Sequence, residues 1–220
     1  MQDRYGPFVS FAVILTTLAI SLGILWMAPP NAMVPVHFSR EWVPDHFVSP
    51  LKGVIIWIGL QLGLWTLMYG LPSLRGSGEG FQASVSVYDA VWITLTAMLG
   101  ILAIASMEQA LGIKIAMGSL TDIMMGGFLI VVGNGLGKLR PNTLVGIRTP
   151  WTKASVRVWD RTHRASGPVF ILAGAVLVAV GFGMFGTHKT HHTYLTVVLL
   201  LAAFSWGLSW LLWKKEQRPG

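Results

Sequence analysis

Long apolar runs separated by short polar stretches dominate this sequence. About 20 apolar residues in a helix cross a bilayer core about 30 Å thick, and six runs reach that length. The joints between the runs carry proline, glycine and polar residues, which break helices. We therefore expect an all-α polytopic membrane protein with six transmembrane helices, near residues 8–28, 53–72, 88–107, 116–137, 167–186 and 194–213.

The composition supports a protein whose main solvent is lipid. Of the 220 residues, 53% are hydrophobic and only 11% are charged, whereas about a quarter of a typical soluble domain is charged. The apolar run that ends at Ala28 is too long for a signal-peptide core and has no small-residue cleavage site, so we interpret it as a retained helix. No cysteine occurs, which excludes disulfides and thiolate metal sites.

Basic residues are unevenly distributed between the two sets of loops. The set that includes both termini holds 12 Lys and Arg residues, and the other set holds only Arg40, Lys52, Lys114 and Lys189. Lys and Arg near helix ends stay in the cytoplasm, so both termini are expected inside (N-in/C-in). The net charge of +7 then reflects topology and attraction to anionic inner-leaflet lipids, and we expect no direct binding of nucleic acid.

Glycine and one glutamine within the apolar runs predict how the helices pack. Small residues at regular spacing let two helix backbones approach closely, so we expect the helices near 116–137 and 167–186 to touch. Gln61 would be costly against lipid and should hydrogen-bond to another helix inside the bundle. The glycines concerned are Gly126, Gly127, Gly133 and Gly137 in the first helix, and Gly167, Gly174 and Gly181 in the second.

The first loop, expected outside the cell, combines histidines and acidic residues with aromatic residues. Imidazole and carboxylate groups suit zinc-type ions, but the loop has no recognised ligand spacing. We therefore favour an interfacial loop whose aromatic rings lie at headgroup level, and we predict no metal and no cofactor. A metal site remains the less favoured alternative, with His37, His46, His188, His191 and His192 as its candidate ligands.

The segment 133–167 has the highest density of polar residues. Thr149 and Pro150 favour a helix start, and basic and apolar residues then follow at helical spacing. This pattern predicts an amphipathic helix along the inner membrane surface between the fourth and fifth spans, anchored by Trp151. Anchoring alone does not need so many hydrogen-bonding groups, and arginine can hold phosphate or carboxylate. The candidate ligand-binding, partner-binding or hinge residues are Asn134, Lys138, Arg140, Asn142, Arg148, Thr149, Trp151, Trp159, His163 and Arg164.

These residues resemble the signature of the SdpI family, bacterial integral membrane proteins named for immunity to a secreted sporulation-delaying toxin. The stretch 34–38 with Asp45 also resembles a Pro-x-His-Phe segment that often precedes that domain, although the family tends to have glycine near Trp42 and an acidic residue near Val156 or Arg157. We expect two regions. Residues 1–110 form a three-helix region with an external recognition loop, and residues 111–220 form an SdpI-like three-helix domain with the signature 133–167 in the cytoplasm. The recognition-loop candidates are His37, Phe38 and Asp45.

The resemblance implies a protein of the bacterial plasma (inner) membrane that protects against an extracellular peptide toxin and, as in the namesake, holds a soluble cytoplasmic repressor at the membrane. It implies no catalysis, no catalytic residue is predicted, and the common hydrolase, zinc-protease and nucleotide-binding motifs do not occur in the sequence. The alternative is a small-molecule or lipid transporter, or a lipid-binding membrane protein, with Gln61, Asn134 and Arg148 along a path. A membrane-embedded hydrolase is a third, less favoured hypothesis.

Overall fold

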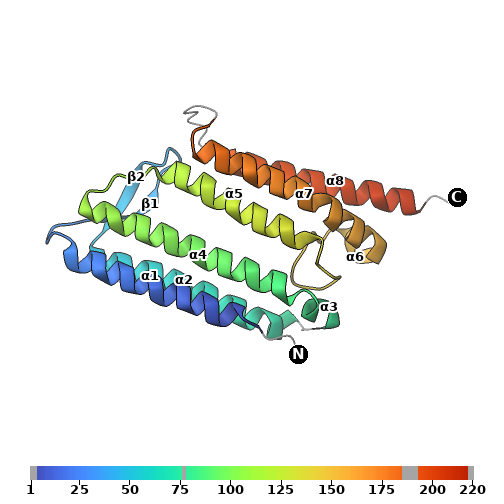
Figure 1. The fold of residues 1–220 in the computed structure, drawn as a ribbon, viewed down its shortest axis with the longest axis horizontal. Helices are drawn as coiled ribbons and strands as arrows, with labels where there is room; N and C mark the ends of the chain where they lie inside the picture. Colours follow the sequence, from blue (N-terminus) through green and yellow to red (C-terminus); the bar gives the residue numbers. More distant parts are fainter. Residues whose placement is uncertain (1–3, 76–77, 185–192, 218–220) are drawn as a thin grey trace.

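Long helices that run alternately in opposite directions make up most of the computed structural model (Figure 1), which describes residues 4–75, 78–184 and 193–217. Within these ranges, six helices are long and apolar enough to cross a membrane. The predicted all-α polytopic membrane protein is therefore confirmed. The six helices are α1 (Gly6–Met27), α2 (Pro50–Arg75), α4 (Val85–Glu108), α5 (Met117–Leu136), α7 (Val156–Gly181) and α8 (Thr193–Glu216).

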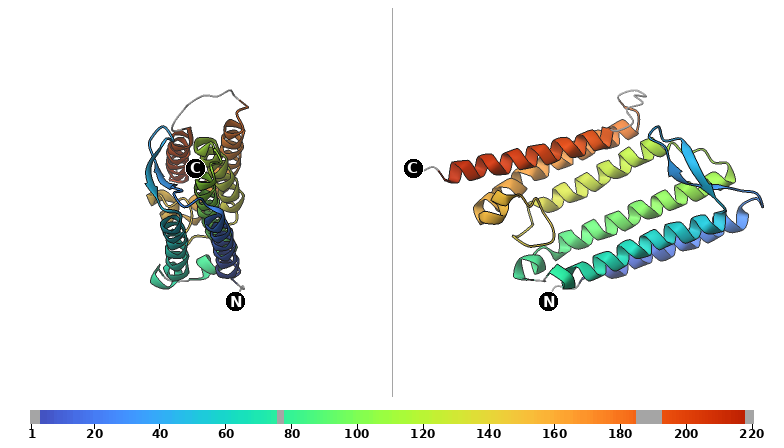
Figure 2. Two further views of the ribbon diagram at one scale, coloured as in Figure 1. Left: turned by 90° about the vertical axis from the view of Figure 1, so that its left-hand side faces the viewer. Right: turned by 180° about the vertical axis from the view of Figure 1, so that it is seen from behind.

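The two ends of the bundle differ. Both termini lie at one end, here called the terminal end, together with the short helices α3 (Glu79–Gln82) and α6 (Pro150–Ala154) (Figure 1). The opposite end, here called the hairpin end, carries the strands β1 (Val34–Phe38) and β2 (Pro44–Val48) and the 3-10 helix η1 (Gln109–Leu111) (Figures 1 and 2). The strands pair in antiparallel register between Val34 and Val48. The sequence indicated only a loop here, because prolines interrupt both short strands and obscure any alternation of polar and apolar residues.

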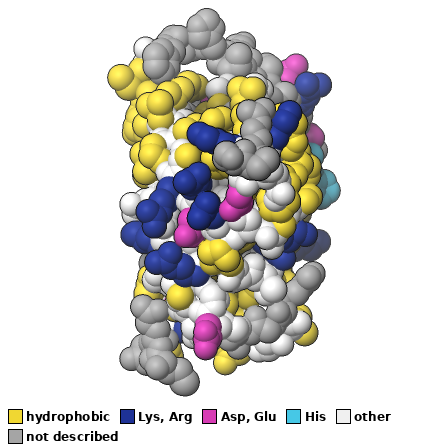
Figure 3. Space-filling view, turned by 90° about the vertical axis from the view of Figure 1, so that its right-hand side faces the viewer, with side chains coloured by type: hydrophobic (Ala, Val, Ile, Leu, Met, Phe, Trp, Pro, Cys, Tyr) yellow, Lys and Arg dark blue, Asp and Glu magenta, His cyan; other side chains and the backbone are white. Residues whose placement is uncertain are grey.

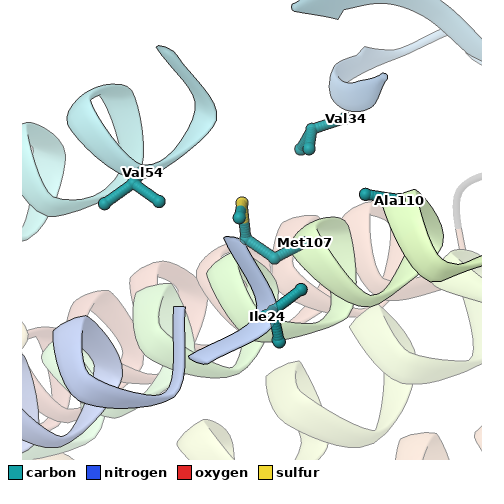
Figure 4. Close-up of a cluster of buried hydrophobic side chains, with 5 residues drawn as sticks. All are labelled: Ile24, Val34, Val54, Met107 and Ala110. Carbon is teal, nitrogen blue, oxygen red and sulfur yellow. The ribbon is translucent and has the colours of Figure 1, made fainter. Parts of the chain in front are cut away.

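The helices pack in an order that follows the chain. α1, α2 and α4 contact one another, α4 contacts α5, α5 packs mainly on α7, and α7 contacts α8 (Figure 2). The hairpin covers the end of the first three helices, where Val34 is fully buried. A cluster of apolar side chains joins β1 to α1, α2, α4 and η1 there (Figure 4) and comprises Ile24, Val34, Val54, Met107 and Ala110.

The closest helix contact lies between α5 and α7, as the glycine spacing predicted. A Cβ atom added to Gly133 would lie 2.7 Å from the carbonyl oxygen of Gly167, and one added to Gly126 would lie 2.5 Å from the carbonyl oxygen of Gly174. The two backbones touch at these points because neither residue has a side chain. Gly127 takes no part, since a Cβ atom there would meet no atom within 4 Å.

Gln61 forms the predicted hydrogen bonds between helices. Its side chain on α2 is fully buried. The Nε2 group donates to the carbonyl oxygen of Thr96 on α4 at 3.1 Å and to Oγ1 of Thr17 on α1 at 3.3 Å. One amide therefore joins all three helices of the first group inside the apolar part of the bundle.

In place of one helix after Thr149, the structure has the short helix α6 and the start of α7. α6 ends at Ala154, and the next residue, Ser155, is extended and caps α7 by accepting from the amide of Val158 at 3.3 Å. Residues 156–166 are the first turns of α7, continuous with the membrane-spanning part. Helical periodicity alone could not show this, because both helices share the same period and the break is a single residue.

Candidate functional site

The signature segment 133–167 lies at the terminal end. It includes the last turn of α5, a loop over residues 137–149, α6 and the first turns of α7 (Figure 1). The buried side chains of Thr152, Trp159 and His163 each form a hydrogen bond with the loop backbone. The segment is therefore a folded unit in which side chains of α7 and α8 fix the shape of the loop.

His163 is the centre of this unit and is 1% exposed. The amide of Ile147 donates to its Nε2 atom at 2.8 Å, and its Nδ1 atom lies 2.8 Å from the carbonyl oxygen of Trp159. A ring nitrogen that accepts from an amide has no proton, and one that faces a carbonyl must carry a proton. The geometry therefore requires the neutral imidazole with the proton on Nδ1.

Trp159 and Gly146 complete the contact. The Trp159 ring stacks on His163 with centroids 4.2 Å apart, and its Nε1 group donates to the carbonyl oxygen of Leu139 at 3.0 Å. Gly146 has a φ of 123°, and a Cβ atom there would lie 2.7 Å from Nε2 of His163. Only glycine fits this backbone conformation so close to the imidazole.

Asn142 and Ser84 hold the first part of the loop. The Oδ1 atom of Asn142 accepts from the amides of Leu144 and Val145, both at 2.8 Å, which is an Asx-type turn. The amide of Arg140 donates to Oγ of Ser84 at 3.0 Å. The loop is thereby tied to the start of α4 in the other group of helices.

Thr149 connects the end of the loop to α8. Its side chain caps α6 by accepting from the amide of Thr152 at 3.2 Å, and its hydroxyl lies 3.0 Å from Oγ of Ser209. Beside this contact, the rings of Trp151 and Trp206 meet edge to face with centroids 5.2 Å apart. Thr149 and Trp151 therefore fix α6 to α8.

The other residues named from the sequence are not gathered into one cavity. The side chains of Asn134, Lys138, Arg140, Arg148 and Arg164 are exposed, while Thr149, Trp159 and His163 are buried. The structure thus separates a buried set, whose members hold the loop, from an exposed set available to a partner. Spacing in the sequence could not separate these two sets.

A basic pocket lies beside the signature unit. Arg157, Arg161 and Arg164 line it together with Val156 and Asp160, and it has a volume of about 490 Å³. Figure 3, which shows the terminal end, has Lys and Arg side chains gathered there with acidic side chains among them. Of the lining residues, only Arg164 was a candidate from the sequence, although the spacing of Arg157 and Arg161 by four residues places them on one helix face.

The hairpin brings together two of the recognition-loop candidates. Nδ1 of His37 lies 2.6 Å from Oδ1 of Asp45, and both side chains are exposed. Phe38 is half-buried beside them. No group of three or more His, Asp or Glu side chains that could hold a metal occurs within residues 4–75, 78–184 and 193–217. His188, His191 and His192 lie outside the described residues, so the alternative metal site between the two loops stays a prediction.

Trp42, at the tip of the hairpin, contacts the second half of the chain. Its ring fills the space over Gly118 at the start of α5, where an added Cβ atom would lie 2.9 Å from Cδ1 of Trp42, and its centroid is 6.4 Å from that of Tyr194 on α8. Trp42 also has a φ of 58°, in the left-handed region that glycine adopts most easily. Glycine would therefore suit this turn. Tryptophan in its place provides the contacts with Gly118 and Tyr194.

Asp89, near the start of α4, was not a candidate from the sequence. The structure buries it completely, with one carboxylate oxygen 2.9 Å from the amide of Gly6 and the other 3.6 Å from Nε of Arg4. The guanidinium of Arg4 also lies 5.5 Å from the ring centroids of Tyr88 and of Trp92. The sequence could have indicated this site, because Tyr88 and Trp92 lie one and three residues from Asp89 and aromatic faces attract a cation.

Part of this chain is similar to known proteins. Over 85 residues the chain is 29% identical to the immunity protein SdpI of Bacillus subtilis (strain 168), and the aligned part covers 39% of this chain. The chain therefore spans only 41% of the length of that relative. No solved structure matches the chain. Residues 138–210 match the SdpI/YfhL protein family, so this segment of the chain is similar to that family.

Proposed function

We propose that this membrane protein is an immunity protein of SdpI type, which protects its cell from an extracellular peptide toxin. The observation that carries the proposal is that the family match falls on residues 138–210, the segment in which His163, Trp159 and Thr149 lock a loop between α7 and α8. A match over a segment whose side chains hold one another in a specific shape supports a shared function better than a match over apolar helices alone, since such helices are common in membrane proteins.

In this proposal the two ends of the bundle have different tasks. The hairpin with His37 and Asp45 meets the toxin, and the exposed basic residues at the terminal end meet a soluble repressor. Trp42 supports a connection between them, because it joins the hairpin to α5 and α8. A toxin shifts the helices only if it binds one arrangement better than the other, and Trp42 is one contact through which that difference reaches the second half of the chain.

The terminal end is proposed to face the cytoplasm, as the distribution of Lys and Arg favours. The chain contains no cysteine, so single cysteines can report its orientation without background. In intact cells, a membrane-impermeant maleimide is expected to label Glu41→Cys on the hairpin and to label Lys153→Cys only after permeabilisation. Labelling of Lys153→Cys in intact cells would reverse the orientation and the division of tasks.

Protection can be tested in a Bacillus subtilis strain that lacks its own SdpI and is exposed to the secreted sporulation-delaying peptide. Expression of the chain is expected to restore survival, and Asp45→Ala is expected to raise the sensitivity to toxin about tenfold, the effect of losing roughly 1.5 kcal/mol of charged hydrogen bonding in recognition. An exposed pair such as His37 with Asp45 contributes at most about 1 kcal/mol to folding, so the variant should still reach the membrane.

Glu41→Ala is the matched control for this experiment, because it removes an exposed carboxylate from the turn of the same hairpin. It should protect as well as the parent protein does. Equal toxin sensitivity of cells with and without the inserted protein would exclude protection against this peptide. Equal protection by Asp45→Ala and the parent would remove the hairpin pair from the recognition surface.

A further inference from the structure

The first turns of α7 are polar although the helix goes on to span the membrane. Arg157, Asp160, Arg161 and Arg164 lie within its first nine residues, and no charged residue follows Arg164 before Lys189. The hydrocarbon-spanning part of α7 therefore begins after Arg164. The Trp151–Trp206 ring pair also lies at this end, and tryptophan collects at the level of lipid headgroups. The basic pocket is thus placed at headgroup depth.

The pocket is an open hollow on the surface, because all five residues that line it lie on the first turns of α7. Arg157 and Arg161 are four residues apart and so lie on one face of α7, and Asp160 and Arg164 lie in the same way on the adjacent face. The stem of Arg164 passes over Gly137, where an added Cβ atom would lie 3.9 Å from its Cγ atom. The lack of a side chain at Gly137 leaves room for this stem at the end of α5.

The charges around the pocket define the ligand it can take. Three guanidinium groups and the carboxylate of Asp160 line it, and Glu216 approaches its edge with Oε1 3.9 Å from Nε of Arg157. The three arginines together with Asp160 and Glu216 have a net charge of +1. Guanidinium groups hold phosphate oxygens through paired donors, whereas a carboxylate accepts hydrogen bonds from hydroxyl groups. The arrangement suits a monoanion that carries both a phosphodiester and free hydroxyls.

We propose that this pocket binds the headgroup of phosphatidylglycerol or a lipid of the same chemistry. The phosphodiester lies between Arg161 and Arg164, and the headgroup hydroxyls donate to Asp160. Val156, which is 64% exposed at the rim, provides apolar contact for the lipid's glycerol and acyl carbons. An acidic protein segment fits less well, because Asp160 would repel its carboxylates. This inference does not depend on the proposed immunity function and can fail or succeed without it.

The test measures lipid binding to the purified full-length protein by native mass spectrometry, with thermal unfolding as the second readout. Phosphatidylglycerol is expected to bind more tightly than phosphatidylethanolamine and to raise the unfolding temperature. Each arginine removed should weaken binding about fivefold, and Arg161→Gln with Arg164→Gln together about 25-fold, as the interaction of a basic residue with an anionic membrane surface implies. Asp160→Asn should reduce the preference for phosphatidylglycerol over phosphatidylserine, which lacks the free glycerol hydroxyls.

Lys215→Gln is the matched control, since it removes one exposed positive charge at the same end without touching the pocket. It should bind phosphatidylglycerol as the parent does. Undiminished binding in the double arginine variant, or equal loss in Lys215→Gln, would overturn the proposal. A shift of the unfolding temperature by inorganic phosphate equal to that by the lipid would also overturn it, because the pocket would then be a site for a soluble anion.

Discussion

Replacing Gly126 by alanine is expected to destabilise the protein by about 2–3 kcal/mol, the usual cost of forcing an extra methyl group into a packed contact. The new Cβ atom would lie 2.5 Å from the carbonyl oxygen of Gly174 and 2.9 Å from the amide nitrogen of Val178. Both are backbone atoms of α7, so no single side chain can move to make room. The two helices must separate, and the neighbouring contact of Gly133 with Gly167 is weakened with them.

Gly127 provides a control one residue away on the same helix. Alanine there meets no atom within 4 Å, and it stabilises a helix relative to glycine. Thermal unfolding of the two variants in the same detergent measures the difference directly. A similar unfolding temperature for both would show that the α5–α7 contact is looser than the structure has it.

His163→Ala is expected to have the second large effect, about 3 kcal/mol. The change leaves the amide of Ile147 without its acceptor, which costs about 1–3 kcal/mol when the group is kept from water, and it removes the ring that stacks on Trp159. The loop over residues 137–149 loses its main attachment to α7. Hydrogen exchange at Ile147 should accelerate, and the loop should become a preferred site of limited proteolysis.

Lys153→Ala is the control for this variant, because Lys153 lies in the same signature segment with an exposed side chain. It should leave both hydrogen exchange and proteolysis unchanged. If His163→Ala keeps the parent's exchange rate at Ile147, the bond from this amide to Nε2 does not hold the loop. Protection against toxin should be lost together with loop order in His163→Ala, so the same variant links the stability of the unit to its proposed activity.

The sequence alone predicted the features that depend on one-dimensional patterns. Twenty apolar residues identify a span wherever they occur, and glycines seven residues apart identify the face along which two helices meet, as Gly126 and Gly133 do with Gly174 and Gly167. Gln61 was predictable because an amide in an apolar helix must find partners. These predictions need no knowledge of which distant residues become neighbours.

Features that depend on distant neighbours could not be predicted. His163 was a candidate ligand-binding, partner-binding or hinge residue, and only the fold shows that its two ring nitrogens face the backbone of Ile147 and Trp159. The burial of Asp89 depends on the fold, which places Arg4 and the first amide of α1 beside it. The division of residues 150–181 into α6 and α7 depends on a single extended residue, Ser155. The hydrogen bond by which its side chain caps α7 stabilises this break by only a small energy relative to a continuous helix.

The partners of α1 have a consequence for biogenesis. The amide of Gly6 donates to Asp89, and the Nε2 group of Gln61 donates to Thr96 and Thr17. Asp89 and Thr96 both lie on α4. Until α4 is inserted, the amide of Gly6 and the side chain of Gln61 therefore lack hydrogen-bond partners that they have in the folded protein. During synthesis from the N-terminus, the α1–α2 pair must therefore wait, held by the insertion machinery or by water, until the third span emerges from the ribosome and closes the group.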